Sequence, residues 1–379
     1  MSEDIKSWAL EIEKKIINKM HPVILRNRNV IPYTTENGNF VDLSSKDINW
    51  WTNGFWGGIL WQMFVLTGED IYKEEAELVE KKLDKVLMDW NGLDHDNGFK
   101  WLPTAVAHYR IDRNEESLNR GLLAANNLAG RFNIKGNYIR AWNNWGDVDR
   151  RGMAIIDCMM NLPLLYWASD VTDDPRFKHI AMEHAQMAMK YFVREDGSVN
   201  HIIRFDPEDG KFIESIGGQG YGVGSSWTRG QSWGIYGFTL SYIHTGEKAF
   251  LNTAKKIADY YISNIPEDGL IPVDFRQPKE PHLEDSTSAA IAACGFIELY
   301  KALSKSQEAS ENEKYINSAY KLLKVLSEKR CIWDEKVDNI LEKCTAAYHD
   351  EKHEFSIIYG DYYFIEAVMK ITGKELFIW

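Results

Sequence analysis

Thr245-Gly-Glu-Lys-Ala-Phe250 belongs to a short pattern that recurs along the chain and organises its helices. Close copies start at Thr67 and Thr372, and a looser copy starts at Thr172. The glycine suits the C-terminus of one helix, and the acidic residue after it suits the first turn of the next. Each copy therefore predicts that one helix ends, the chain turns tightly and a partner helix begins.

Apolar residues at helical spacing predict twelve helices around these turns. Helices that precede a turn are apolar and carry Gly, Ala and Trp, whereas those that follow are amphipathic and charged. This alternation is typical of an inner ring of buried helices inside an outer ring of solvated ones. We therefore predict an all-α (α/α)6 barrel, a toroid of six helix hairpins, with a linear helical solenoid as the alternative. The predicted helices span 4–19, 51–66, 71–88, 101–111, 115–131, 152–169, 175–192, 228–245, 247–263, 285–303, 311–328 and 358–372.

No Pro-rich linker, low-complexity segment or long charge block divides the 379 residues. We predict a single domain over residues 1–379, in which residues 1–40 supply an N-terminal helix and a lead-in segment. Strand-like patterns are few and short, as in 198–204 before the turn at 206–210.

Fourteen tryptophans and a net charge of −12 mark the composition. Trp faces are common platforms for sugar rings, although large helical cores also use them. The negative charge disfavours nucleic acid and anionic membranes as partners, but it permits a small anionic ligand held by local Arg and His residues. The N-terminus lacks a signal-peptide pattern, and no apolar stretch is long enough to span a bilayer. We expect a cytoplasmic monomer or small homo-oligomer.

Aromatic and glycine-rich loops lie just before the apolar helices. In a barrel of this kind such loops meet at one mouth, where we expect a ligand pocket. The loops are 47–54, 142–146, 217–227 and 281–285.

Familiar cofactor and metal patterns are absent from the sequence. The glycines from Gly218 to Gly224 fit neither a dinucleotide-binding nor a phosphate-binding loop. There is no H-E-x-x-H, and the histidines lack the spacing of metal ligands. We expect no metal and no cofactor.

Two aspartates in unlike surroundings are candidates for acid–base chemistry. Asp157 lies within the apolar helix predicted at 152–169, where an unpaired carboxylate is costly and tends to find a partner or keep its proton. From this stretch alone, a structural role and a catalytic acid are equally supported. Asp96 lies in the polar turn 94–99, and taken alone it is better explained as an ordinary turn residue. Together they suggest one protonated and one ionised carboxyl, as in enzymes acting on sugars.

A second candidate cluster follows the glycine-rich loop. Arg229 and Trp233 stand at i,i+4 in the helix predicted at 228–245, which places a guanidinium beside an indole. That pairing suits a ring carrying a carboxylate, since Arg binds the anion while Trp stacks on the ring. The structural alternative is an Arg–Trp stack inside the core.

Several motifs occur in the order of a known family. They are His95-Asp96-x-Gly98-Phe99, Ile156-Asp157-Cys158-x-x-Asn161-Leu162-Pro163, Asn200-His201, Gly218-Gln219-Gly220, Ser226-Trp227-Thr228-Arg229-Gly230-Gln231-x-Trp233, Glu284-Asp285-x-x-x-Ala289-Ala290 and Tyr359-Gly360-Asp361-Tyr362-Tyr363. Together they resemble the unsaturated glucuronyl hydrolases, glycoside hydrolase family 88. The family fold is an (α/α)6 barrel.

The resemblance implies a substrate and a reaction. Members act on oligosaccharides released by polysaccharide lyases, such as chondroitin or hyaluronan disaccharides, and remove the 4,5-unsaturated uronic acid at the non-reducing end. They hydrate the C4=C5 double bond, and the resulting hemiketal opens and sheds the next sugar. The resemblance implies that Asp157 protonates C4 and activates the attacking water, while Asp96 orients the substrate and tunes the proton transfer.

The resemblance also implies a binding site for the unsaturated uronate. His201, Gln219, Trp227, Arg229 and Trp233 match positions that hold this sugar. Trp50, His95 and Trp142 are expected as further wall contacts. Members that bind sulfated substrates use a loop with serines and a lysine, whereas the comparable segment here, 344–352, keeps a lysine but no serine. A preference for sulfated or unsulfated substrate therefore stays open.

Three other functions are compatible with parts of the sequence. The first is hydrolysis of unsaturated galacturonyl-rhamnose from pectin. The second is a sugar 2-epimerase or isomerase on the same barrel, for which His201 and His282 would have to serve as the proton-shuttling pair. The third is a non-enzymatic carbohydrate-binding or scaffold protein, which would leave a buried Asp157 without a purpose.

Overall fold

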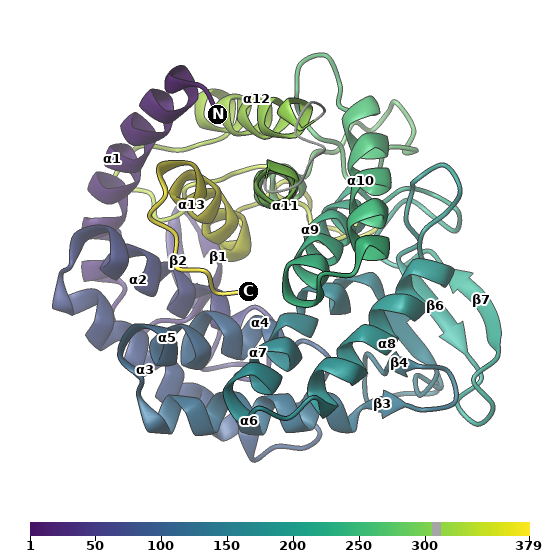
Figure 1. The fold of residues 1–379 in the computed structure, drawn as a ribbon. Helices are drawn as coiled ribbons and strands as arrows, with labels where there is room; N and C mark the ends of the chain where they lie inside the picture. The colour runs from purple at the N-terminus through teal and green to yellow at the C-terminus, as the bar shows by residue number, and fades with distance from the viewer. Residues whose placement is uncertain (305–311) are drawn as a thin grey trace.

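The computed structural model describes residues 1–304 and 312–379, and its helices form two concentric rings (Figure 1). Neighbouring inner helices pack on one another, and the last of them, α13, also packs against α2 and α1, which closes the ring. The (α/α)6 barrel is therefore confirmed, and the closed ring excludes the linear solenoid. The inner ring, within the described ranges, consists of α2 (Asn53–Thr67), the continuous stretch α4 (Asn97–Trp101), η1 (Leu102–Val106) and α5 (Ala107–Asp112), α7 (Leu162–Thr172), α9 (Thr228–Thr245), α11 (Ser286–Ser304) and α13 (Ile358–Thr372).

Outer helices cover this inner set. They are amphipathic, as α3 illustrates: it buries Tyr72, Ala76, Val79 and Leu83, which recur every three to four residues along one face. By contrast, every residue of α9 from Thr228 to Ser241 is buried. The outer helices are α1 (Glu3–Arg26), α3 (Asp70–Leu87), α6 (Glu115–Gly130), α8 (Arg176–Tyr191), α10 (Lys248–Ser263) and α12 (Glu313–Lys329); residue 311, the predicted start of the last one, lies outside the described residues.

The recurring Thr-Gly turns end three inner helices as expected. Gly68, Gly246 and Gly373 adopt left-handed φ values of 75°, 75° and 74°, which a residue with a side chain rarely adopts. A partner helix follows Gly68 and Gly246, but none follows Gly373, so the prediction is wrong at the third copy. The outer position beside α13 is filled by α1 instead, and Thr372 donates a hydrogen bond to Glu13 of that helix at 2.8 Å.

The helix predicted at 152–169 begins later than expected. Its first residues form the strand β5 (Met153–Ile155), and a short 3-10 helix, η2 (Ile156–Met160), leads into α7. The apolar pattern of a buried strand cannot be distinguished from that of a buried helix, and Pro163 favours the first turn of α7. Asp157 therefore lies in the 3-10 turn η2 between β5 and α7, and its predicted place inside an α-helix is wrong.

The described residues also form small antiparallel sheets. β5 pairs with β6 (Ile202–Phe205), and β6 pairs with β7 (Phe212–Ile216), both antiparallel. This three-stranded sheet carries the strand predicted before the turn at 206–210 and brings the residues after β5 beside those before β6. Two further hairpins are β1 (Pro32–Glu36) with β2 (Asn39–Asp42) and β3 (Phe132–Asn133) with β4 (Tyr138–Ile139). Across the described ranges, no helix is both long and apolar enough to cross a membrane.

Candidate active site

A cavity of about 460 Å³ opens where three of the four predicted loops meet. The fourth loop, 281–285, supplies no lining residue. The walls contain seven of the predicted site residues, namely Trp50, His95, Asp96, Trp142, Asp157, His201 and Gln219. They also contain Asp47, Asn49, Trp51, Gly92, Asp94, Ile155, Ile202 and Gly218, which were not predicted as site residues.

Asp157 reaches this cavity from the turn between β5 and α7. The main chain of Ile156 donates to the carbonyl of His201 at 3.1 Å, which fixes the turn against the three-stranded sheet. Burial raises the pKa of Asp157 to about 7, although the charge of Arg229 and the indole of Trp233 act in the opposite direction. Asp157 Oδ1 has no hydrogen-bond partner among the described residues. A carboxyl group in this setting retains a proton near neutral pH and can deliver it to a ligand.

Asp96 lies in the predicted turn, immediately before α4, and is only 8% exposed. Burial raises the pKa of Asp96 well above its usual value, and the nearby charges of Asp94 and Asp157 raise it further. Both carboxyl groups are thus driven towards the neutral form, because two buried like charges cannot readily ionise together. At most one of the two carboxyl groups is therefore readily ionised.

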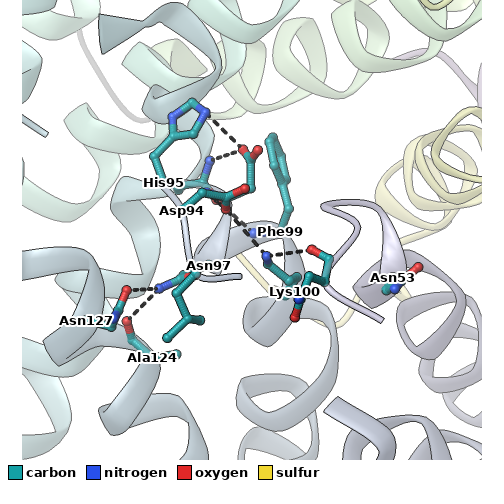
Figure 2. Close-up of polar contacts among 12 residues, drawn as sticks. Asn53, Asp94, His95, Asn97, Phe99, Lys100, Ala124 and Asn127 are labelled. Atoms are coloured by element: carbon teal, nitrogen blue, oxygen red, sulfur yellow. Dashed lines mark hydrogen bonds and ion pairs between the residues drawn. The ribbon is translucent and has the colours of Figure 1, made fainter. Parts of the chain in front are cut away.

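Buried polar contacts hold the start of α4 in place (Figure 2). The ammonium of Lys100 donates to the carbonyl of Asn49 at 3.0 Å and lies 3.4 Å from Asp94 Oδ1. On the other side of α4, Asn97 donates to Asn127 Oδ1 at 2.9 Å on α6. Lys100 therefore joins two of the loops that form the cavity.

His201 and His95 face the two aspartates as neutral rings. Burial lowers the pKa of His201 to about 3 and that of His95 to about 4. The main-chain N–H of Gln219 donates to His201 Nδ1 at 2.9 Å, so the ring proton is on Nε2, which lies 3.8 Å from Asp157 Oδ1. His95 Nε2 lies 3.5 Å from Asp96 Oδ1. Each carboxyl group therefore has an imidazole beside it.

Arg229 lies behind the cavity wall rather than in it. It is 1% exposed, forms an ion pair with Asp285, and donates to the carbonyls of Thr345, at 2.7 Å, and Ala346. Its guanidinium lies 4.6 Å from the ring centre of Trp227. The predicted pairing of Arg229 with the indole of Trp233 is therefore wrong. Trp233 instead packs against Phe99 in the barrel interior, with ring centres 5.2 Å apart. These three residues support the wall from α9 and its first turn.

Metal ligation finds no support in the part of the chain that the structure describes, since no group of three or more His, Cys, Asp or Glu side chains there is placed to hold an ion.

Known proteins resemble this chain in both sequence and fold. No family model matches the sequence. An unsaturated glucuronyl hydrolase from Bacillus sp. (strain GL1) is 36% identical over 335 residues, which cover 87% of this chain and 88% of that protein. The chain belongs to the unsaturated glucuronyl hydrolases. An unsaturated chondroitin disaccharide hydrolase from Streptococcus pyogenes serotype M1 is 33% identical, over 84% of this chain and 80% of that protein.

Solved structures of unsaturated glucuronyl hydrolases have the same fold. One, an aspartate-to-asparagine variant with the tetrasaccharide dGlcA-Glc-Rha-Glc, has a TM-score of 0.87 and 32% identity, and 95% of each chain is covered. Another, an aspartate-to-asparagine variant from Streptococcus agalactiae with dGlcA-GalNAc6S, has a TM-score of 0.83 and 27% identity, with 99% of this chain and 94% of that chain covered. This unsaturated glucuronyl hydrolase is therefore a glycosidase, as the motifs suggested.

Some functional contacts of this hydrolase were not predicted as such from the sequence. Asp285 occurs in a family motif, but its role as the buried partner of Arg229 depends on a contact across 56 residues of sequence. Asp94 lines the cavity only two residues before Asp96, and its acidic neighbourhood was a usable signal. Asn161 also occurs in a motif, but its contacts emerge only in three dimensions.

A substitution in the loop at 217–224 should have a measurable effect on activity. Gly218 has a φ of +65°, and a Cβ there would lie 2.0 Å from His201 Nδ1. We expect Gly218→Ala to displace His201 and Gln219 and to lower kcat/KM of the hydrolase at least about tenfold, since misplaced groups in an active site cost activity steeply. Steady-state kinetics together with a thermal melt measure this.

Gly222 in the same loop provides the matched control. A Cβ at Gly222 meets no atom within 4 Å. Gly222→Ala is expected to keep wild-type kinetics, and equal losses in both variants would show that general loop flexibility, rather than the contact with His201, is responsible.

Proposed function

We propose that this enzyme removes the 4,5-unsaturated uronic acid from the non-reducing end of glycosaminoglycan-type disaccharides, such as those of chondroitin or hyaluronan. The observation that carries the proposal is the buried Asp157 carboxyl, with a pKa of about 7, in a cavity that it shares with Asp96. The relatives support the substrate class, because one is named for unsaturated chondroitin disaccharides and the two ligand-bound structures hold oligosaccharides that begin with dGlcA. We further propose that the whole ring acts as one catalytic domain.

The chemistry begins with proton transfer to carbon. The substrate is an enol ether, and protonation of C4 by Asp157 leaves a positive charge at C5 that is shared with the ring oxygen. The carboxylate formed on Asp157, together with that of Asp96, stabilises this charge. Asp157 then takes a proton from the water that attacks C5, and the hemiketal opens to release the second sugar. Each step uses a group that already faces the cavity.

Binding of the uronate follows from the surrounding side chains. Trp50, Trp142 and His95 form walls against which a sugar ring packs, while His201 and Gln219 offer polar groups beside Asp157. Arg229, with Trp227 beside it, supplies positive charge from behind the wall, close enough to lower the pKa of Asp157, and the indole of Trp233 acts on that pKa in the same direction. An anionic ligand entering a protein of net charge −12 benefits from this local charge.

The other functions lack comparable support. A 2-epimerase would require His201 and His282 in one pocket, but His282 is exposed and does not line the cavity. None of the relatives described above is named for a pectin product. A carbohydrate-binding protein without activity does not explain a proton-retaining Asp157 that opens into the cavity.

The proposed activity is tested with a panel of lyase-generated disaccharides. The unsaturated uronate absorbs ultraviolet light, and we expect this absorbance to disappear when the enzyme is added to chondroitin or hyaluronan disaccharides. Sulfated and unsulfated forms, and unsaturated galacturonyl-rhamnose, belong in the same panel. Unchanged absorbance with every disaccharide would refute the proposal, and faster turnover of the pectin product would replace the substrate class.

The pH dependence follows from the state of the acid. Asp157 donates a proton, so the active fraction falls once the pH exceeds its pKa of about 7. We expect kcat to decline by about tenfold per pH unit well above that value, provided that proton donation limits the rate. Initial rates between about pH 5 and about pH 9, on either side of this pKa, measure the profile. A kcat that rises across the alkaline range would contradict the role of Asp157 as the acid.

A further inference from the structure

Asn161 connects the two aspartates. It lies immediately before α7 and is fully buried. Its side-chain amide donates to Asp96 Oδ1 at 3.2 Å and to the main-chain oxygen of Asp157 at 3.3 Å. Its side-chain oxygen accepts from the main-chain N–H of Phe99 at 2.8 Å. One amide group thus joins the start of α4 to the turn that carries Asp157.

The packing around this amide leaves it little freedom. A Cβ on Gly98 would lie 2.5 Å from the Cα of Asn161 and 2.6 Å from its Oδ1. Only glycine permits this approach, which brings α4 against the first turn of α7. The orientation of the amide is also determined, because the main-chain N–H of Phe99 can only donate and therefore requires the oxygen of Asn161 on its side.

We propose that Asn161 is a positioning residue of the reaction, which holds the two carboxyl groups at a fixed separation and keeps their shared proton on Asp157. The proposal rests on the hydrolase function proposed above. An amide N–H can stabilise an ionised oxygen but cannot accept a proton from a carboxyl group. Its donation to Asp96 therefore favours the ionised form of Asp96, whereas Asp157 Oδ1 has no such donor within the described residues. The donation therefore opposes the burial and the charges of Asp94 and Asp157, which favour the proton on Asp96, and it shifts the proton towards the carboxyl group that must deliver it.

Other charged and titratable groups also face the pair. The start of α4 contributes Asp94, His95 and Lys100, and neighbouring elements contribute Arg131, Cys158, His201 and Arg229. His95 and His201 are neutral, and Cys158 retains its proton because burial raises the pKa of its thiol. Lys100 lowers the pKa of Asp96, whereas Arg229 and the indole of Trp233 lower that of Asp157, so the Asn161 amide is the neutral donor that acts on Asp96.

The test uses Asn161→Asp and Asn161→Ala. Asn161→Asp keeps the shape of the side chain and an acceptor for Phe99, but it removes the donor to Asp96 and adds a third carboxyl group. We expect kcat to fall about tenfold or more, as for loss of a hydrogen bond to a charged group, with KM little changed. Because Asp96 then holds its proton more tightly, the acid limb of the kcat–pH profile moves up by about one pH unit. Asn161→Ala removes the same donor and should move the limb in the same direction.

Asn97→Ala is the matched control. Asn97 is equally buried and adjacent to Asp96, but its amide points away, to Asn127 and Ala124 on α6 (Figure 2). We expect Asn97→Ala to lower stability while leaving the pH profile unchanged.

The outcomes separate this inference from the activity on which it rests. An upward shift of the acid limb in the Asn161 variants alone supports the inference. An active wild type with the same pH profile in all variants overturns it, because a purely structural asparagine would lower stability without moving the profile. A wild type that is inactive on every disaccharide removes the proposed function itself.

Discussion

Asp157→Asn is expected to lower kcat of this hydrolase by about 100- to 10,000-fold, the usual contribution of a general acid and base. The amide has nearly the shape of the carboxyl group but cannot donate an acid proton, so the substrate should still bind. Loss of ultraviolet absorbance measures turnover, and calorimetric titration with an unsaturated disaccharide measures binding. Unchanged turnover would remove Asp157 from the chemistry.

Asp361→Asn provides a demanding control for this result. Burial raises the pKa of Asp361 to about 7 as well, but its carboxyl accepts from the main-chain N–H groups of Ile340 and Leu341 at 2.9 and 2.7 Å and does not line the cavity. Asn at this position turns its amide N–H towards the main-chain N–H of Ile340 or Leu341, and two donors then face each other. Stability should therefore fall while kcat of the folded protein persists. The comparison separates burial of a carboxyl group from its participation in the reaction.

Asp157→Asn should also change stability in a pH-dependent way. The folded-state pKa of Asp157 lies above its ordinary value, so the folded wild type binds a proton that the unfolded chain has already lost. Its stability therefore decreases as the pH rises from the ordinary pKa towards about 7. The variant lacks this ionisation, and its melting temperature relative to wild type should increase over the same interval. A difference that is constant with pH would contradict the raised pKa.

Arg229→Met is expected to lower the free energy of unfolding more than any of the other substitutions proposed above. Met fills similar space but leaves the carboxylate of Asp285, which is 0% exposed, without its cation. Breaking a buried ion pair in this way costs about 3–5 kcal/mol, which urea unfolding at neutral pH would detect. Activity should fall too, because Arg229 binds the carbonyl of Ala346, to which the Gln219 side chain also donates at 2.8 Å.

Two controls distinguish the buried charge from the loss of any arginine. Arg151 pairs with Asp149 at 2.9 Å, but both side chains are about half exposed, so Arg151→Met should cost less than about 1 kcal/mol. The double variant Arg229→Met, Asp285→Asn removes both buried charges and should recover part of the stability. If it is as unstable as the sum of the single variants, the ion pair does not explain the loss.

Helical periodicity and the Thr-Gly turns were sufficient to predict the barrel, because both are local properties of the sequence. The pattern failed at 153–157, where a buried strand and a buried helix are equally apolar and only pairing with β6 decides between them. The aromatic loops predicted the position of the cavity because the ends of neighbouring inner helices meet at the same mouth of a ring.

Contacts between distant residues were beyond such reasoning. Arg229 and Trp233 were expected to stack because of their spacing. The position of the guanidinium instead depends on Trp227 and on Asp285, which lies just before another inner helix, α11. Likewise, the amide of Asn161 meets Asp96 across 65 residues of sequence. The residue types at these sites were recognisable from the motifs, whereas their partners depend on how the rings close.

The closure of the ring by α1 and α13 has a consequence for biosynthesis. Glu13 of α1 accepts hydrogen bonds from Thr372 and, at 2.5 Å, from Lys374, so these contacts of α1 can form only after α13 and the residues that follow it have been synthesised. The apolar residues Ile5, Ala9, Ile12 and Ile16 of α1 are buried in the closed ring, and we expect them to be more exposed until it closes, a condition that favours aggregation. A circular permutant in which α1 follows α13 would convert this contact into a local hairpin and should fold faster.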